Sequence, residues 1–221
     1  MPLAHKKYYT LGIASENKSL WALHKDFGAY AVPWADVPDK ATVLNVGCGA
    51  AALQGAVNID VSQLPGVDVV HDLNVFPWPF DDEQFNHVIA HHVVEHMNDV
   101  VGFMSEVYRV LTPGGVLEVL TPHYSDGGSW VDPTHHWHLH TSSFLYFEEG
   151  HPFCYYSRCR FKCLVDVELA RIWRLLGFQF LVNLVSRFPS ALWIRRLWEN
   201  HLSFVVRGKT IRALCMKPTG G

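Results

Sequence analysis

Short apolar runs alternate with polar, glycine-containing turns along the middle of the chain, and this pattern predicts an α/β protein. Between two of these runs, Val100, Phe103, Met104 and Val107 recur at helical spacing, which predicts a helix over residues 99–111. The sequence Leu-Thr-Pro-Gly-Gly would end that helix. We expect five strands, at residues 43–46, 56–59, 67–70, 85–90 and 116–120.

The two flanks of this central region carry weaker patterns. At the N-terminal end, residues 1–40 read as a cap segment with one helix at 15–30. On the C-terminal side we expect helices at 142–147, 166–176 and 189–201, a sixth strand at 178–185, and a closing hairpin from 203–206 and 210–216 that supplies an antiparallel edge strand. No internal repeat divides the chain, so we expect a single domain over residues 1–221.

A glycine turn follows the first strand directly. Gly47 and Gly49 permit positive φ and a close approach of a ligand to the backbone. The next strand ends in Asp60, at the place where a ribose diol is held in nucleotide-binding sheets. Asp60 comes thirteen positions after Gly47, whereas in dinucleotide-binding folds the acidic residue comes about twenty positions after the glycine. The pattern therefore indicates a nucleoside-containing cofactor and argues against a dinucleotide.

Composition narrows the class of protein further. The chain has 221 residues and a formal net charge of −3, which gives no electrostatic reason to expect a nucleic-acid partner. No apolar run reaches the length of about eighteen residues that a membrane span requires, and the N-terminus lacks a signal-peptide core. We expect a cytoplasmic protein. Five cysteines, an odd number, make a secreted disulfide framework improbable.

Five motifs in this order resemble the class I S-adenosylmethionine-dependent methyltransferases, particularly small bacterial-type members with a shortened first crossover. They are LNVGCG, NID, HDLN, HHVVEH and YRVLTPGGVLEVLTP, and they span about residues 40–122. The resemblance implies a Rossmann-like, doubly wound sheet of seven strands with an antiparallel last strand. In this chain the short segment 50–57 replaces the usual first helix, which leaves open which amides contact the carboxylate of the cofactor.

The resemblance also implies how S-adenosylmethionine binds. Gly47 and Gly49 would line its methionine portion, Asp60 would hold the ribose hydroxyls, and Asp72 with Leu73 would flank the adenine. Asp72 could instead be a simple turn aspartate. The full set of predicted cofactor-binding residues is Asn45, Gly47, Cys48, Gly49, Asp60, Val61, Asp72, Leu73 and His91.

The chain contains fourteen histidines, more than one general base requires, and they cluster after the fourth and fifth strands. Methyl transfer to an alcohol, phenol or ammonium requires loss of a proton, a task that suits histidine near neutral pH. The predicted catalytic or acceptor-binding residues are His91, His92, His123 and His136. The resemblance makes residues 121–165 the acceptor-binding insertion, and its aromatic residues suit a planar small molecule.

A metal is the alternative use of the histidines. His92, Glu95 and His96 could join a later histidine around a divalent ion, as in the metal-dependent RNA-terminal 2′-O-methyltransferases that this H-x-x-E-H pattern faintly resembles. Similar motifs occur in metal-free members of the family, and we therefore expect no metal. The spacing of Cys154, Cys159 and Cys163 does not match a paired zinc site either.

The sequence thus predicts methyl transfer from S-adenosylmethionine to a small-molecule acceptor, at oxygen or nitrogen. One alternative is methylation of RNA or of a saccharide, which predicts a basic groove. Another is a non-catalytic cofactor-binding subunit, which predicts binding without transfer. A nicotinamide oxidoreductase agrees least with the motifs. The oligomeric state does not follow from the sequence.

Overall fold

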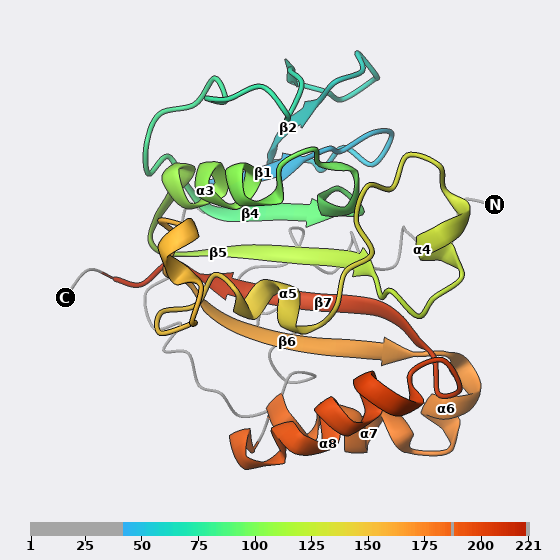
Figure 1. The fold of residues 1–221 in the computed structure, drawn as a ribbon. Helices are drawn as coiled ribbons and strands as arrows, with labels where there is room; N and C mark the ends of the chain where they lie inside the picture. Colours follow the sequence, from blue (N-terminus) through green and yellow to red (C-terminus); the bar gives the residue numbers. More distant parts are fainter. Residues whose placement is uncertain (1–41, 187, 220–221) are drawn as a thin grey trace.

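The computed structural model describes residues 42–186 and 188–219, which form a single seven-stranded sheet. The strand order is β3-β2-β1-β4-β5-β7-β6 (Figure 1). The strands are β1 (Val43–Val46), β2 (Val57–Asp60), β3 (Val69–Val70), β4 (Phe85–His91), β5 (Leu111–Pro122), β6 (Lys162–Leu169) and β7 (Gly208–Met216).

Strands β1 to β5 run parallel, while β7 is antiparallel to both of its neighbours, β5 and β6. The predicted Rossmann-like sheet of seven strands with an antiparallel last strand is therefore confirmed. One detail was wrong, because β7 lies inside the sheet and β6 forms its edge.

The helical segments are short, and α3 is the longest of those in the described part of the chain. They are η1 (Val94–His96), α3 (Val100–Val110), α4 (Gly128–Val131), α5 (Ser142–Leu145), η2 (Cys154–Tyr156), α6 (Arg171–Leu175), α7 (Phe178–Val182), η3 (Asn183–Ser186), η4 (Pro189–Ala191), α8 (Leu192–Leu197) and η5 (Trp198–Leu202). Figure 1 shows α3 lying over the sheet beside β4, and α6 to α8 running along the edge formed by β6.

Helix α3 forms where its apolar spacing predicts it. The Asp99 side chain accepts a hydrogen bond from the Gly102 amide at 2.9 Å and so caps the N-terminus. The apolar face of the helix buries Phe103, Met104 and Val107 in the main core. Val94 of η1, the short helical turn before α3, is buried in the same core.

The region between β6 and β7 departs from the prediction. The expected helix at 166–176 is strand β6 up to Leu169, and the expected strand at 178–185 is α7 followed by η3. Residues 203–206 form a turn instead of a hairpin strand. Helix α5 and the helical segment from η4 to η5 agree with the predicted helices at 142–147 and 189–201.

A single asparagine organises the short connection between β1 and β2, which contains no helix among its described residues 47–56. The side-chain oxygen Oδ1 of Asn58 accepts from the Leu53 backbone amide at 2.7 Å and from the Asn45 side chain at 3.0 Å. The side-chain nitrogen Nδ2 of Asn58 donates to the Leu53 carbonyl at 3.0 Å. The Asn58 side chain thus stabilises a connection that has no helix. The predicted shortened first crossover is therefore confirmed.

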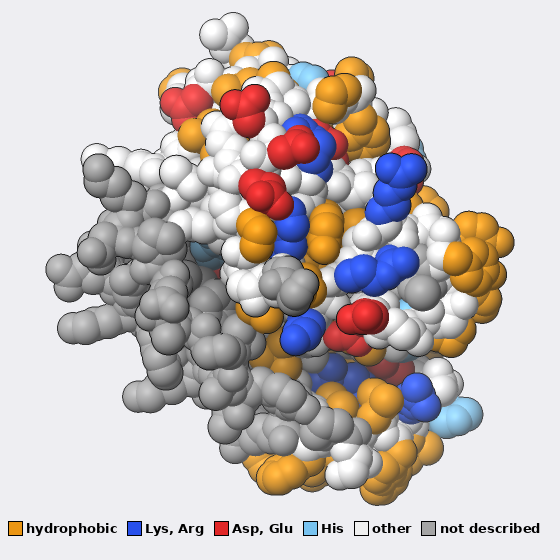
Figure 2. All heavy atoms as spheres, turned by 90° about the vertical axis from the view of Figure 1, so that its left-hand side faces the viewer, with side chains coloured by type: hydrophobic (Ala, Val, Ile, Leu, Met, Phe, Trp, Pro, Cys, Tyr) orange, Lys and Arg blue, Asp and Glu red, His pale blue; other side chains and the backbone are white. Residues whose placement is uncertain are grey.

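Many large apolar side chains on α6 to η5 are exposed, including Leu175 and Trp193. Figure 2 shows hydrophobic side chains interspersed with arginines and lysines towards the lower end of the molecule. No helix in residues 42–186 or 188–219 is long and apolar enough to cross a membrane. The N-terminal cap segment and its helix at 15–30 lie outside the described residues.

Candidate cofactor and acceptor site

The glycine turn after β1 adopts backbone angles that glycine alone tolerates well. Gly47 has φ +59° and Gly49 has φ +50°. A Cβ atom on Gly47 would lie 2.6 Å from Cγ2 of Val93, which follows β4. The turn at position 47 is therefore closed against the neighbouring strand end, whereas a Cβ on Gly49 would meet no atom within 4 Å.

Asp60 faces this turn from the end of β2. Its Oδ2 accepts a hydrogen bond from the Gly49 amide at 2.7 Å, and its Oδ1 accepts from the Ser62 amide at 2.8 Å. The carboxylate is thereby fixed and nearly buried, at 9% exposure. A carboxylate offers about four lone-pair sites, so two amides leave capacity for the hydroxyls of a diol.

The neighbouring predicted residues have different roles. Asn45 is buried and bonded to Ala51 and Asn58, so it supports the turn from beneath. Cys48 is also buried, and burial raises the pKa of its thiol, which keeps it uncharged. Val61 is exposed beside Asp60.

Asp72 and Leu73 follow β3. Oδ1 of Asp72 accepts from the amide of Asn74 at 2.9 Å and from its side chain at 3.2 Å, an arrangement typical of a turn aspartate. The carboxylate is exposed, while Leu73 is buried and accepts a hydrogen bond from Trp78. The contact with adenine expected for Asp72 and Leu73 stays a prediction.

His91 ends β4 and belongs to a buried ionic cluster. Its Nε2 lies 2.8 Å from Oε1 of Glu118, and Nε2 of His87 lies 3.5 Å from Oε2 of the same carboxylate. Burial alone would raise the pKa of Glu118, but hydrogen bonding and charge from His87 and His91 outweigh it and hold that pKa well below its usual range. Glu118 lies on β5 and was not among the predicted site residues.

His92 is the next residue, and its backbone is unusual. It is a non-glycine residue with φ +56°, a conformation that is concentrated at functional sites. Its side chain is 44% exposed, and its Nδ1 lies 3.2 Å from Oε1 of the buried Glu95. His92 therefore stands at the carboxyl end of β4, next to the turn that carries Gly47.

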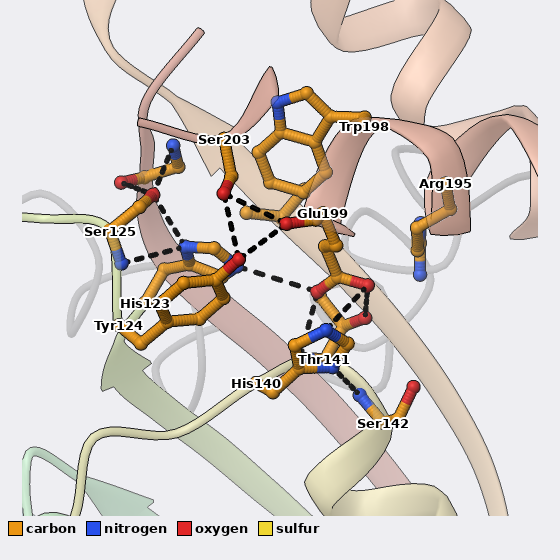
Figure 3. A network of polar contacts seen from close by, with 12 residues as sticks. His123, Tyr124, Ser125, His140, Thr141, Ser142, Arg195, Trp198, Glu199 and Ser203 are labelled. Atoms are coloured by element: carbon orange, nitrogen blue, oxygen red, sulfur yellow. Dashed lines mark hydrogen bonds and ion pairs between the residues drawn. The ribbon is translucent and has the colours of Figure 1, made fainter. Parts of the chain in front are cut away.

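His123 lies in the interior and connects distant parts of the chain (Figure 3). Its Nδ1 accepts from the Ser125 amide at 3.2 Å, and its Nε2 lies 3.4 Å from Oε1 of Glu199 in η5. The same carboxylate accepts from the Thr141 hydroxyl at 2.9 Å, and the Tyr124 hydroxyl donates to the Glu199 carbonyl at 2.6 Å. Both ring nitrogens of His123 thus hold the fold together at this point.

Glu199 is a partner of the predicted residue His123 that the sequence analysis missed. It is 76 residues from His123, and no motif surrounds it that would connect the two.

His136 has an exposed side chain, while its backbone amide donates to the Glu95 carbonyl at 2.8 Å. That bond holds the segment after β5 against η1.

The structure also brings together three residues that can bind a metal. Single ligand atoms of Glu95, His96 and His135 all lie within 4.8 Å of one another. The cysteines form no comparable group among the described side chains, because Cys159 contacts Ser105 while Cys163 contacts Cys215 on the paired strand.

Comparisons with known proteins agree with this geometry. Residues 60–119 match the model of the methyltransferase domain family. A probable S-adenosylmethionine-dependent methyltransferase from Mycolicibacterium smegmatis is 41% identical over 61 residues, which are 28% of this chain and 23% of that relative. The match thus spans about a quarter of the relative's length.

Two solved structures share the fold. A SAM-dependent methyltransferase from Archaeoglobus fulgidus has a TM-score of 0.55 at 13% identity, over 96% of this chain and all of the other. The YcgJ protein from Bacillus subtilis has a TM-score of 0.51 at 15% identity, over 82% of this chain and 93% of the other.

The strand order and the glycine turn facing an acidic strand end define a protein of the class I methyltransferase fold. Within this fold, residues 60–119 are similar to the methyltransferase domain family and to a probable S-adenosylmethionine-dependent methyltransferase. The cofactor of this class is S-adenosylmethionine.

Proposed function

We propose that this protein transfers the methyl group of S-adenosylmethionine to an oxygen or nitrogen atom of a small-molecule acceptor. The observation that carries the proposal is the 2.7 Å hydrogen bond between the Gly49 amide and Asp60. It joins the ends of two adjacent parallel strands, where open α/β sheets bind their ligands. The turn supplies backbone for the methionine portion, and the carboxylate supplies acceptors for the ribose.

The aromatic side chains between β5 and β6 favour a small aromatic or planar molecule as the acceptor. It is tied to the end of β4, because the Trp137 indole donates to the Met97 carbonyl at 2.7 Å. Trp130 and Trp137 are both exposed, and Trp130 stacks on His138 with ring centroids 3.5 Å apart. Flat rings near a strand end favour a flat ligand.

The proton of the acceptor has two candidate recipients among the predicted histidines. His92 and His136 have exposed side chains next to η1, whereas His123 is enclosed and His91 is bonded to Glu118. We assign the predicted general base to this exposed pair. His92→Gln and His136→Gln should each leave cofactor affinity unchanged, and the variant that removes the base should lower the rate of transfer by about 10²-fold or more.

Calorimetric titration with S-adenosylmethionine and S-adenosylhomocysteine tests the cofactor site. We expect binding that Asp60→Asn weakens about tenfold or more, because an amide cannot replace a carboxylate that accepts from two hydroxyls. The matched control is Asp81→Asn, which changes an exposed aspartate before β4. Equal affinity in the wild type and Asp60→Asn would contradict this site.

Transfer is measured separately with methyl-labelled cofactor and a panel of phenols, amines, sugars and short RNAs. The proposal requires label in a small phenol, alcohol or amine. Label that enters RNA or a saccharide alone would replace the small-molecule acceptor with the corresponding alternative. Binding of cofactor without transfer to any acceptor of the panel would favour a non-catalytic subunit.

A further inference from the structure

We propose that Glu95, His96 and His135 bind a divalent transition-metal ion. The three side chains come from two separate segments, η1 and the loop between α4 and α5, and each presents a ligand atom within 4.8 Å of the others. This proposal departs from the expectation of no metal that the sequence alone gives. It rests on contacts that the fold creates, and it does not depend on the proposed methyl transfer.

The tautomer of His96 is fixed by its surroundings. Its Nδ1 lies 3.2 Å from the Thr134 carbonyl and 3.0 Å from the Thr134 hydroxyl. That hydroxyl donates its one hydrogen to Oδ1 of Asp132 at 2.6 Å, so both oxygens can act towards His96 as acceptors alone. Nδ1 therefore carries the proton, and in the neutral ring Nε2 carries the lone pair that a metal needs.

His135 is oriented in the same way. Its Nδ1 lies 3.0 Å from the carbonyl oxygen of Ser129, which can only accept. The Nε2 atom again carries the lone pair. A hydrogen bond from the second ring nitrogen to a backbone carbonyl is the usual support for a metal-binding histidine. Both imidazoles are thus prepared for a cation before one arrives.

The carboxylates near these rings supply negative charge. Glu95 is 1% exposed, and its two oxygens are held by the Thr121 hydroxyl at 2.9 Å and by His92 at 3.2 Å. Oδ2 of Asp132 lies 3.9 Å from Nε2 of His135. A buried carboxylate with a fixed orientation beside two imidazoles stabilises a cation more strongly than any of these groups alone.

The ligand types define the class of metal. Two imidazole nitrogens and one carboxylate oxygen suit Zn²⁺, Mn²⁺, Fe²⁺ or Co²⁺ better than Mg²⁺ or Ca²⁺, which prefer oxygen ligands. Three protein ligands leave coordination positions open for water or for an oxygen atom of another molecule. Because η1 follows β4 in the chain, an ion here lies near the carboxyl end of that strand.

Titration of the metal-stripped full-length protein with Co²⁺ tests the proposal, with visible absorption as the readout and no cofactor added. We expect one ion per chain with micromolar or tighter affinity. His96→Gln and His135→Gln should each weaken binding about tenfold or more, as loss of a ligand or of its support does. His138→Gln is the matched control, because His138 is exposed on the same loop but lies outside the three-residue group.

Two results would overturn the proposal. One is the absence of a saturable Co²⁺ signal in the wild type; the other is equal affinity in the wild type, His135→Gln and His96→Gln. Circular dichroism of each variant separates lost ligation from lost folding. Titration of the same samples with S-adenosylmethionine keeps failure of the metal site distinguishable from failure of the cofactor site.

Discussion

At the scale of single residues, Gly47 and Gly49 form a natural comparison. Both have positive φ, but a side chain on Gly47 would collide with Val93 at 2.6 Å, whereas Gly49 has open space. We expect Gly49→Ala to cost about 1–2 kcal/mol for the backbone conformation alone. Gly47→Ala should cost at least about 1 kcal/mol more, because of the overpacking against Val93. Urea unfolding of the two variants measures the difference, and equal costs would contradict the closed turn.

Glu118 gives a prediction about pH. Its pKa is lowered in the folded protein, so its stabilising effect is fully present above the pKa of an unfolded glutamate, about 4.3, and is lost as pH falls through the folded value. We expect Glu118→Gln to lower the free energy of unfolding at pH 7, and we expect this difference to shrink below about pH 4. Denaturant unfolding at several pH values measures it. The control is Glu149→Gln, at an exposed residue, and a deficit that stayed constant down to pH 2 would refute the assignment.

Local signals in the sequence predict part of the candidate site at this scale. Asp60 and Gly47 stand in contiguous motifs, because the turn and the strand end have local backbone requirements. No local signal marks Glu118 or Glu199, because their contacts with His91 and His123 form only when the sheet and η5 bring distant residues together. Whether Asp72 contacts adenine also depends on a ligand and not on its own turn.

At the scale of elements, strand β6 is an edge strand whose outer side is covered by side chains. The Asn183 side chain accepts from the Val167 amide at 3.0 Å and donates to the Val167 carbonyl at 2.8 Å, as a neighbouring strand would. Gln179 accepts from the Leu169 amide at 3.1 Å. Helix α7 and η3 therefore protect this edge from pairing with another chain.

Removal of the Asn183 amide should expose that edge. We expect Asn183→Ala to lower the free energy of unfolding by about 1–3 kcal/mol, because two backbone groups of Val167 lose their partners. Asn200→Ala, at an exposed asparagine, should change it by less than about 0.5 kcal/mol. Thermal and urea unfolding compare the two variants. If Asn183→Ala were as stable as Asn200→Ala, the amide would not act as a strand substitute.

The same contacts explain which elements the sequence could predict. In helix α3 and the central strands the apolar residues recur at a clear period and the ends carry clear signals. The sequence pattern is therefore sufficient to predict these elements. Residues 178–185 are apolar and read as a strand, but Gly177 with φ +79° begins a helical turn that places Gln179 and Asn183 against β6. Tertiary contacts thus override a local preference there.

At the scale of the whole molecule, charge and apolar surface are unevenly distributed. Residues 170–209 contain seven arginines and lysines and one acidic residue, Glu199, although the chain has a net charge of −3. This segment also exposes many large apolar side chains, among them Leu175 at 78% and Leu202 at 46%. Such a surface favours association in water.

We expect Leu175→Lys combined with Leu202→Lys to raise the solubility of the protein while changing the free energy of unfolding by no more than about 0.5 kcal/mol per site. Because both side chains are exposed, their replacement removes few packing contacts. Precipitation assays and thermal unfolding measure the two quantities. Leu44→Lys provides the contrasting control, because Leu44 is buried at 0% exposure and should not tolerate the charge. A large loss of stability in the double variant would show that these residues are packed.

The inner position of β7 has a consequence for how the protein is made. Strand β6 is hydrogen-bonded in the sheet to β7, which comes after it in the chain. During translation, β6 and the helices after it are synthesised before the strand that joins them to β5 exists. The parallel half can assemble while the chain is still growing, but its union with the C-terminal half has to wait for residues 208–216. A nascent chain stalled before that point would be a half-sheet with β5 as its open edge, and such an edge is prone to pairing with other chains until β7 covers it.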